Sequence, residues 1–93
     1  MNYRLVFTHN YTKRAERFVR QHPELLRQYE KVLRLLELDP FHPALRLHKL
    51  SGRLSRLHAV SINIHYRIAL ILELGGHTIT PVHIGTHEEV YRE

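Results

Sequence analysis

Two helical stretches that follow one another almost without a connection constrain this chain more than any other feature of its sequence. Apolar side chains recur at helical spacing over residues 10–22 and again over residues 23–39. Pro23 suits the first turn of the second helix, and Pro40 ends it. A connection as short as residues 21–23 makes the pair an antiparallel hairpin. Because each helix has one apolar face, the hairpin must pack on another layer, and we expect a sheet.

The remaining segments have the alternating pattern of β-strands. Gly75-Gly76 predicts a hairpin turn. Pro81 predicts a bulge or an edge, because proline donates no hydrogen bond to a neighbouring strand. Thr86 is a candidate cap for a final short helical turn. The expected extended segments are residues 2–7, 45–50, 57–62, 64–74 and 78–84.

These patterns predict one α+β domain over residues 1–93, since a chain of 93 residues has room for a single core. The helix hairpin should cover one face of an antiparallel sheet of about four strands. Twelve residues that share the inward faces of these elements form the predicted core: Leu5, Phe7, Phe18, Val19, Leu25, Tyr29, Val32, Leu36, Ile68, Leu70, Leu72 and Val82.

Composition excludes several functional classes. The chain has no cysteine, which rules out disulfides, iron–sulfur clusters and thiol nucleophiles. Its apolar runs are too short to cross a membrane, and its first residues are too mixed for a secretion signal. We therefore expect a cytoplasmic protein that has no contact with a membrane.

Positive charge is concentrated in the first part of the chain. Residues 1–56 hold 12 basic and 5 acidic residues, whereas residues 57–93 hold 2 basic and 4 acidic residues. Eleven of the 14 basic residues are arginine, whose planar fork pairs with phosphate and stacks on bases. This balance favours RNA, DNA or an acidic protein as partner, and a merely solvated surface is the alternative interpretation.

Four short strings occur in order along the chain. They are Asp39-Pro40 with His42-Pro43, His48-Lys49-Leu50-Ser51-Gly52, Tyr66-Arg67-Ile68, and Ile84-Gly85-Thr86-His87-Glu88-Glu89-Val90-Tyr91. With the order of the predicted elements, they resemble the RelE/ParE superfamily of bacterial toxins, and within it the RelE-like and YafQ-like mRNA interferases. The resemblance implies a RelE-like fold and the toxin of a type II toxin–antitoxin system.

The resemblance also implies an activity and a partner. Such a toxin is silenced by a cognate antitoxin protein and cuts mRNA in the ribosomal A site, which inhibits translation. The superfamily also contains ParE-like members that inhibit DNA gyrase and cut nothing, so that function and an inactive antitoxin-binding relative stay as alternatives. Free toxin should be a monomer. We expect the antitoxin to contact the arginines of the helix hairpin, with a plain solvated face as the alternative interpretation. These residues are Arg14, Arg17, Arg20 and Arg27.

A nuclease without a metal ion or other cofactor, as expected here, must use the 2′-hydroxyl of RNA as its nucleophile. A base removes the hydroxyl proton, a cation stabilises the phosphorane, and an acid protonates the 5′ oxygen. By the resemblance, His48 and His87 match the two histidines of the YafQ-like pattern, and Arg67 matches a common phosphate ligand. Tyr91 matches the terminal aromatic residue that stacks on a base or positions the substrate.

Further candidates surround these four residues. His65, by strict alternation, and His83 could lie beside Arg67 and take part in catalysis. The YafQ-like acidic residue near Tyr66 is absent, as is a tryptophan near position 57, which leaves open which histidine is the base. His83 and His87 have the spacing of a helical metal pair but lack a third ligand, so no metal site is predicted. RNA-binding residues are expected in the basic stretch after His48: Lys49, Arg53 and Arg56.

Overall fold

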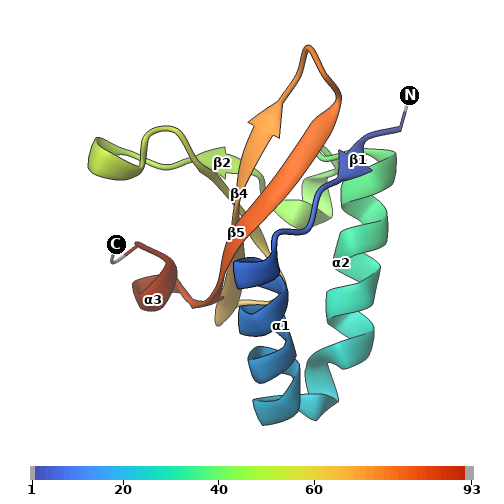
Figure 1. Cartoon of the computed structure of the whole chain (residues 1–93), viewed down its shortest axis with the longest axis vertical. Helices are drawn as coiled ribbons and strands as arrows, with labels where there is room; N and C mark the ends of the chain where they lie inside the picture. The colour runs from blue at the N-terminus through green and yellow to red at the C-terminus, as the bar shows by residue number, and fades with distance from the viewer. Residues whose placement is uncertain (1, 92–93) are drawn as a thin grey trace.

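In the computed structural model, which describes residues 2–91, two helices pack on one face of a five-stranded sheet (Figure 1). The strands are β1 (Arg4–Leu5), β2 (His48–Lys49), β3 (His58–Ser61), β4 (Tyr66–Glu73) and β5 (Thr78–Thr86), in the order β1-β5-β4-β3-β2. The predicted α+β architecture is confirmed. The sheet has one strand more than expected and is not purely antiparallel, because β1 pairs with β5 in parallel.

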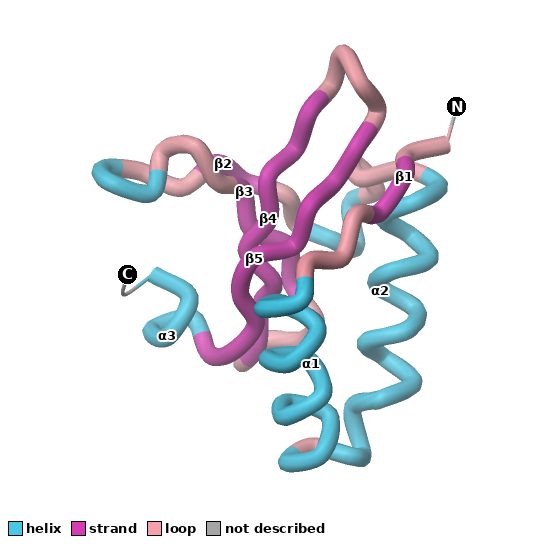
Figure 2. The backbone as a smooth tube through the Cα atoms, viewed as in Figure 1, coloured by secondary structure: helices cyan, strands magenta, loops and turns pink. Residues whose placement is uncertain are grey.

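The helix hairpin has the predicted form. Helix α1 (His9–Gln21) is capped by the Thr8 hydroxyl, which accepts a hydrogen bond from the Tyr11 amide at 3.1 Å. The 3₁₀ turn η1 (Pro23–Leu25) leads directly into α2 (Leu26–Leu38). Figure 2 shows both helices on the same side of the strands. Within residues 2–91, none of the helices has the length and apolar character needed to cross a bilayer.

The core lies between the hairpin and the sheet. Of the twelve predicted core residues, six are buried, and Leu5, Val19, Leu25 and Leu72 pack against them partly buried. Phe7 is a wrong prediction: β1 ends at Leu5, and the Phe7 ring is 49% exposed. Val82 is also wrong, because it lies outside the core cluster and is only half buried.

A β-bulge explains the position of Val82. Ala69 pairs with His83 and Leu70 pairs with Pro81, so Val82 is the extra residue between these two pairs. The bulge occurs next to Pro81, where the sequence predicted an irregularity. It allows Pro81 and Ile84 to lie on the buried side of β5 although their positions differ by an odd number of residues.

The segment between α2 and β3 is less extended than predicted. Residues 43–45 form the 3₁₀ turn η2 (Pro43–Leu45), Arg46 has a positive φ of 52°, and only His48 and Lys49 pair as a strand. The 3₁₀ turn η3 (Gly52–Leu54) follows. Because this edge strand is so short, the flanking turns rather than a regular pleat determine the direction of the side chains.

The opposite face of the sheet has its own small buried cluster. Helix α3 (His87–Tyr91) contacts β4 and β5 and lies on the side of the sheet away from the hairpin (Figure 1). Four residues buried outside the main core belong to this region: Leu50, Ala59, Ala69 and Val90. Ala59 and Ala69 face each other across β3 and β4, and their small side chains leave space above the sheet.

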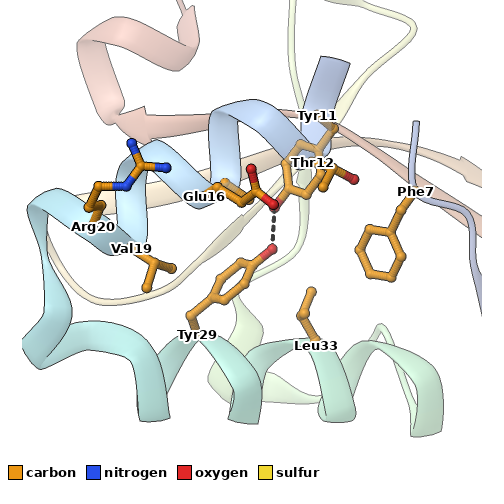
Figure 3. Close-up of a pocket in the computed structure, with 9 residues that line it drawn as sticks. Phe7, Tyr11, Thr12, Glu16, Val19, Arg20, Tyr29 and Leu33 are labelled. Carbon is orange, nitrogen blue, oxygen red and sulfur yellow. Dashed lines mark hydrogen bonds between the residues drawn. The ribbon is translucent and has the colours of Figure 1, made fainter. Parts of the chain in front are cut away.

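An apolar cavity of about 630 Å³ separates α1 from α2 (Figure 3). The exposed Phe7 ring lines its end and stacks on Tyr11 with 6.2 Å between ring centroids. At its floor the hydroxyls of Tyr11 and Tyr29 hydrogen bond at 2.9 Å. Burial raises the pKa of Tyr11 and that of Tyr29 above the ordinary value.

This tyrosine pair predicts sensitivity to alkaline conditions. Because the folded-state pKa values are raised, the stabilisation is fully present below about pH 10 and is lost as the pH rises further. For the native chain, the free energy of unfolding measured in urea should be lower at about pH 10.5 than at about pH 8. The double variant Tyr11→Phe/Tyr29→Phe has nothing to ionise there and should show a smaller drop; an equal drop would contradict the assignment.

Candidate active site

Four of the predicted site residues lie on the sheet face opposite the helix hairpin. His48 pairs with Ala59, Ala59 pairs with Ala69, and Ser61 pairs with Arg67. Residues directly opposite each other on antiparallel strands point to the same side, so His48 and Arg67 share a face. Helix α3 brings Tyr91 and His87 over that face.

The hydrogen bonds of His48 determine where its ring proton lies. Its Nδ1 is 3.0 Å from the Arg46 carbonyl oxygen, which can only accept, so Nδ1 carries the hydrogen. In the neutral ring Nε2 then has the free lone pair, and it accepts a short hydrogen bond from the Tyr91 hydroxyl. His48 therefore presents a proton acceptor at the face that also holds Arg67.

Arg46 is a site residue that sequence reasoning missed. Its left-handed backbone, at φ 52° and ψ 44°, ends η2 and aims its carbonyl at His48. Arginine has no preference for this conformation, which costs a non-glycine residue of order 1 kcal/mol. No signal in the sequence marks it, because glycine or asparagine would be the usual choice.

Arg67 is a half-buried cation without a hydrogen-bond partner for two of its nitrogens. Nε and Nη1 are both shielded from solvent, and neither donates a hydrogen bond to any described residue. Native proteins rarely leave buried donors unpaired, and an unpaired desolvated guanidinium is costly. With a change of rotamer that exposes them, these two nitrogens would bind a pair of phosphate oxygens. This is the feature of the site that most directly points to an anionic ligand.

Tyr91 connects the two histidines. Its ring stacks on that of His87, with 4.1 Å between centroids and 13° between planes. Burial raises the pKa of the Tyr91 hydroxyl, and the Arg67 charge lowers it to a lesser degree. The Tyr91 hydroxyl is therefore neutral at physiological pH and donates a hydrogen bond to His48.

Helix α3 is held at its first turn by a capping box. The Glu89 amide donates to the Thr86 hydroxyl at 3.1 Å, and the Thr86 amide donates to Glu89 Oε1 at 2.8 Å. The predicted cap at Thr86 is confirmed. A helix of five residues is unstable alone, so this box and the buried Val90 position His87 and Tyr91.

Gly85 leaves the space that Glu89 occupies, and this gives a testable prediction. A Cβ at Gly85 would lie 2.5 Å from Glu89 Oε1 and 3.2 Å from Glu89 Cβ. Gly85→Ala should therefore break the capping box and shift α3. We expect the activity of the candidate site to fall by about 10- to 100-fold while thermal unfolding shows that the fold persists. The matched control is Gly75→Ala, where no atom lies within 4 Å of an added Cβ; similar activity in both variants would contradict the prediction.

The two additional histidine candidates have other neighbours. β4 begins at Tyr66, so the alternation does not extend to His65, whose amide donates to the Asn63 side chain and whose ring lies beside Tyr66. After the bulge His83 pairs with Ala69, two residues from Arg67 on β4, and its Nε2 is 3.1 Å from Arg14 Nη1 of α1. Neither histidine has a described contact with His48, Arg67 or Tyr91.

The predicted RNA-binding residues lie in and after β2, and Lys49 lies on the strand face opposite that of His48. Arg53 and Arg56 line a cavity of about 210 Å³ together with Ile71. Ile71 lies four residues after Arg67 on β4 and therefore on the same face of that strand. Lys49 is exposed on β2 and pairs with His58. Burial lowers the pKa of His58, and the nearby Lys49 and His48 lower it further.

Within residues 2–91, no three histidine, aspartate or glutamate side chains come close enough together to hold a metal ion.

No family model matches the sequence. No curated protein matches it either. Solved structures do match. YafQ from Escherichia coli strain BL21(DE3) gives a TM-score of 0.77 at 10% identity, covering 96% of this chain and 98% of that one. The chain has the RelE/YafQ-like toxin fold.

Two further matches show how widely this RelE-like fold is shared. A YoeB/ParE toxin from Agrobacterium tumefaciens gives a TM-score of 0.73 at 17% identity, covering 90% of this chain and 98% of its own. The toxin–antitoxin complex RelBE2 from Mycobacterium tuberculosis gives 0.64 at 16% identity, with coverages of 94% and 100%. Identities this low establish the fold, and function is argued from the site.

Proposed function

We propose that this protein is the toxin of a type II toxin–antitoxin pair and that it cleaves mRNA on the ribosome without a metal ion. The observation that carries the proposal is the pair of Arg67 nitrogens without hydrogen-bond partners, beside the His48–Tyr91 hydrogen bond on one sheet face. A phosphate ligand next to a proton acceptor is what 2′-hydroxyl attack on RNA requires. The fold shared with YafQ is consistent with this activity.

The proposed reaction uses each group once. The substrate 2′-hydroxyl replaces the Tyr91 hydroxyl at His48 Nε2 and gives its proton to that nitrogen. The 2′ oxygen bonds to phosphorus, and Arg67 stabilises the charge on the phosphorane oxygens. The bond from phosphorus to the 5′ oxygen breaks as protonated His87 delivers a proton to that oxygen. The products are a 2′,3′-cyclic phosphate and a 5′-hydroxyl, and Tyr91 holds a flanking base by stacking.

Primer extension on a reporter mRNA tests the activity. After induction of the chain alone, we expect translation arrest and new 5′ ends within the reading frame that are absent for Arg67→Ala. Intact mRNA with DNA damage would instead support gyrase inhibition of the ParE type. Arrest of growth with neither change would overturn both functions.

We also propose that a cognate antitoxin covers the helix hairpin and blocks the site. The similar RelBE2 structure is a toxin–antitoxin complex. In this chain, the apolar cavity between α1 and α2, the exposed Phe7 ring and the arginines along α1 offer contacts to an amphipathic acidic segment. Free protein should run as a monomer in size exclusion, and it should co-purify with the antitoxin when both are expressed.

A further inference from the structure

A second polar cavity lies at the ends of β4 and β5, on the other side of α3 from the candidate site. Its volume is about 430 Å³. Helix α1 supplies Arg14 and Arg17, His22 directly follows the helix, and Tyr66 and His83 come from the two strands. None of these residues has a role in the reaction proposed above.

The cavity carries positive charge that the described residues do not neutralise. Arg14 Nη1 donates to His83 Nε2 at 3.1 Å, and His83 Nδ1 donates to the Ile84 carbonyl at 3.2 Å, so this histidine is neutral and orients the guanidinium. No carboxylate of a described residue lies within ion-pair distance of Arg14 or Arg17. Glu89, the acidic residue of the lining, accepts from the Thr86 amide and keeps its charge, so the two arginines leave the lining with an excess of positive charge.

Aromatic rings form one wall of the cavity. The rings of His22 and Tyr66 lie 4.7 Å apart between centroids, and Phe18 supports both at 4.8 and 5.2 Å. The His22 side chain remains 26% exposed. Arginines next to partly exposed rings suit a nucleotide, because the arginines bind its phosphate and the rings stack on its base. An acidic peptide would use the arginines and leave the rings without a function.

The cavity and the candidate site share the same structural support. Tyr66 pairs with Thr86, and the adjacent pair is Arg67 with Gly85. In α3, residues 87 and 91 share one face because they are four positions apart, whereas residue 89 lies on the other side. The short helix α3 therefore stands between the two regions, and a flexible RNA strand can follow its surface from one to the other.

We propose that this cavity is a second RNA subsite, which binds a nucleotide flanking the cleavage point through Arg14, Arg17 and the His22–Tyr66 rings. The proposal rests on the proposed function for its substrate class, since it takes RNA to be what the protein binds. It assigns α1 a role in substrate binding that is separate from contacts with a protein partner.

Binding of uncleavable RNA tests the subsite separately from catalysis. Fluorescence anisotropy would follow 2′-O-methyl oligoribonucleotides of about 4 and about 12 nucleotides. We expect Arg14→Gln/Arg17→Gln to weaken binding of the longer oligonucleotide by about tenfold or more. Loss of two phosphate contacts should also reduce the slope of log affinity against log salt by about 1.4. The matched control is Lys31→Gln/Arg34→Gln, two exposed basic residues with the same spacing on α2.

The outcomes separate this proposal from the function on which it rests. If the α1 double variant binds the longer oligonucleotide as the control does, the subsite is refuted, even when mRNA is cleaved normally. If the variant keeps RNA affinity but no longer binds the antitoxin, the cavity is a protein contact and the subsite is again refuted. A selective loss of RNA affinity supports the subsite, and it does so even if primer extension finds no cleavage.

Discussion

Arg67→Ala is expected to lower the rate of RNA cleavage by about 100- to 1000-fold and to leave the melting temperature unchanged or raised. The loss of activity follows from removing the charge that stabilises the phosphorane. The gain or neutrality in stability follows from the two buried nitrogens, whose desolvation no described partner offsets. A residue kept at a cost to stability is typical of a functional site.

Cleavage of a model RNA and thermal unfolding of the same preparations would measure both effects. Arg67→Lys serves as the conservative comparison, because it keeps the charge but loses the bidentate fork, and it should recover part of the rate. A drop of several degrees in the melting temperature of Arg67→Ala would show that the guanidinium supports the fold, and full activity would remove Arg67 from the site.

His48→Ala should reduce cleavage by about 100- to 10,000-fold, because the variant lacks the proposed base. Tyr91→Phe is the informative partner. It keeps the ring that stacks on His87 but loses the hydroxyl that occupies His48 Nε2. The phenylalanine variant should therefore stay within about tenfold of the native rate, since substrate binding must displace that hydroxyl in any case.

Single-turnover cleavage of one oligoribonucleotide would compare the two variants with His9→Ala, an exposed histidine at the start of α1. The control should cleave at the native rate. Equal, severe losses in His48→Ala and Tyr91→Phe would mean that the phenol itself transfers a proton, and native activity in His48→Ala would place the base elsewhere.

Local patterns in the sequence were enough to predict the layers of the fold. Helical periodicity places both ends of α1 and the end of α2 within one residue. The start of α2 was predicted three residues too early, because residues 23–25 form the 3₁₀ turn η1. The parallel pairing of β1 was not predictable, because it depends on where β5, more than seventy residues away, runs beside it. Phe7 lies outside the core because the strand ends before it. The alternating pattern predicts which residues share a strand face, but it does not predict how far along the chain the strand stays paired.

The candidate site was predictable where it depends on short-range chemistry. The Thr86–Glu89 spacing indicates the cap of α3, and the strings around His48, Arg67 and Tyr91 indicate residues that the fold gathers on one face. The position of His83 depends on the bulge at Val82, which shifts the register so that His83 pairs with Ala69, and its ring contacts Arg14. The backbone of Arg46 depends on how η2 ends. Both are consequences of long-range packing, which a single sequence does not record.

The short edges of the sheet bear on how the free protein behaves among its own copies. β1 and β2 are two residues long each, and beyond Ile79 no described strand pairs with the β1 side of β5, where Pro81 and the bulged Val82 interrupt the ladder. Long, regular edges recruit strands from other molecules and begin aggregation. This chain offers a neighbour almost no continuous backbone to pair with. Copies released from a partner are therefore expected to remain dispersed and refoldable rather than to precipitate.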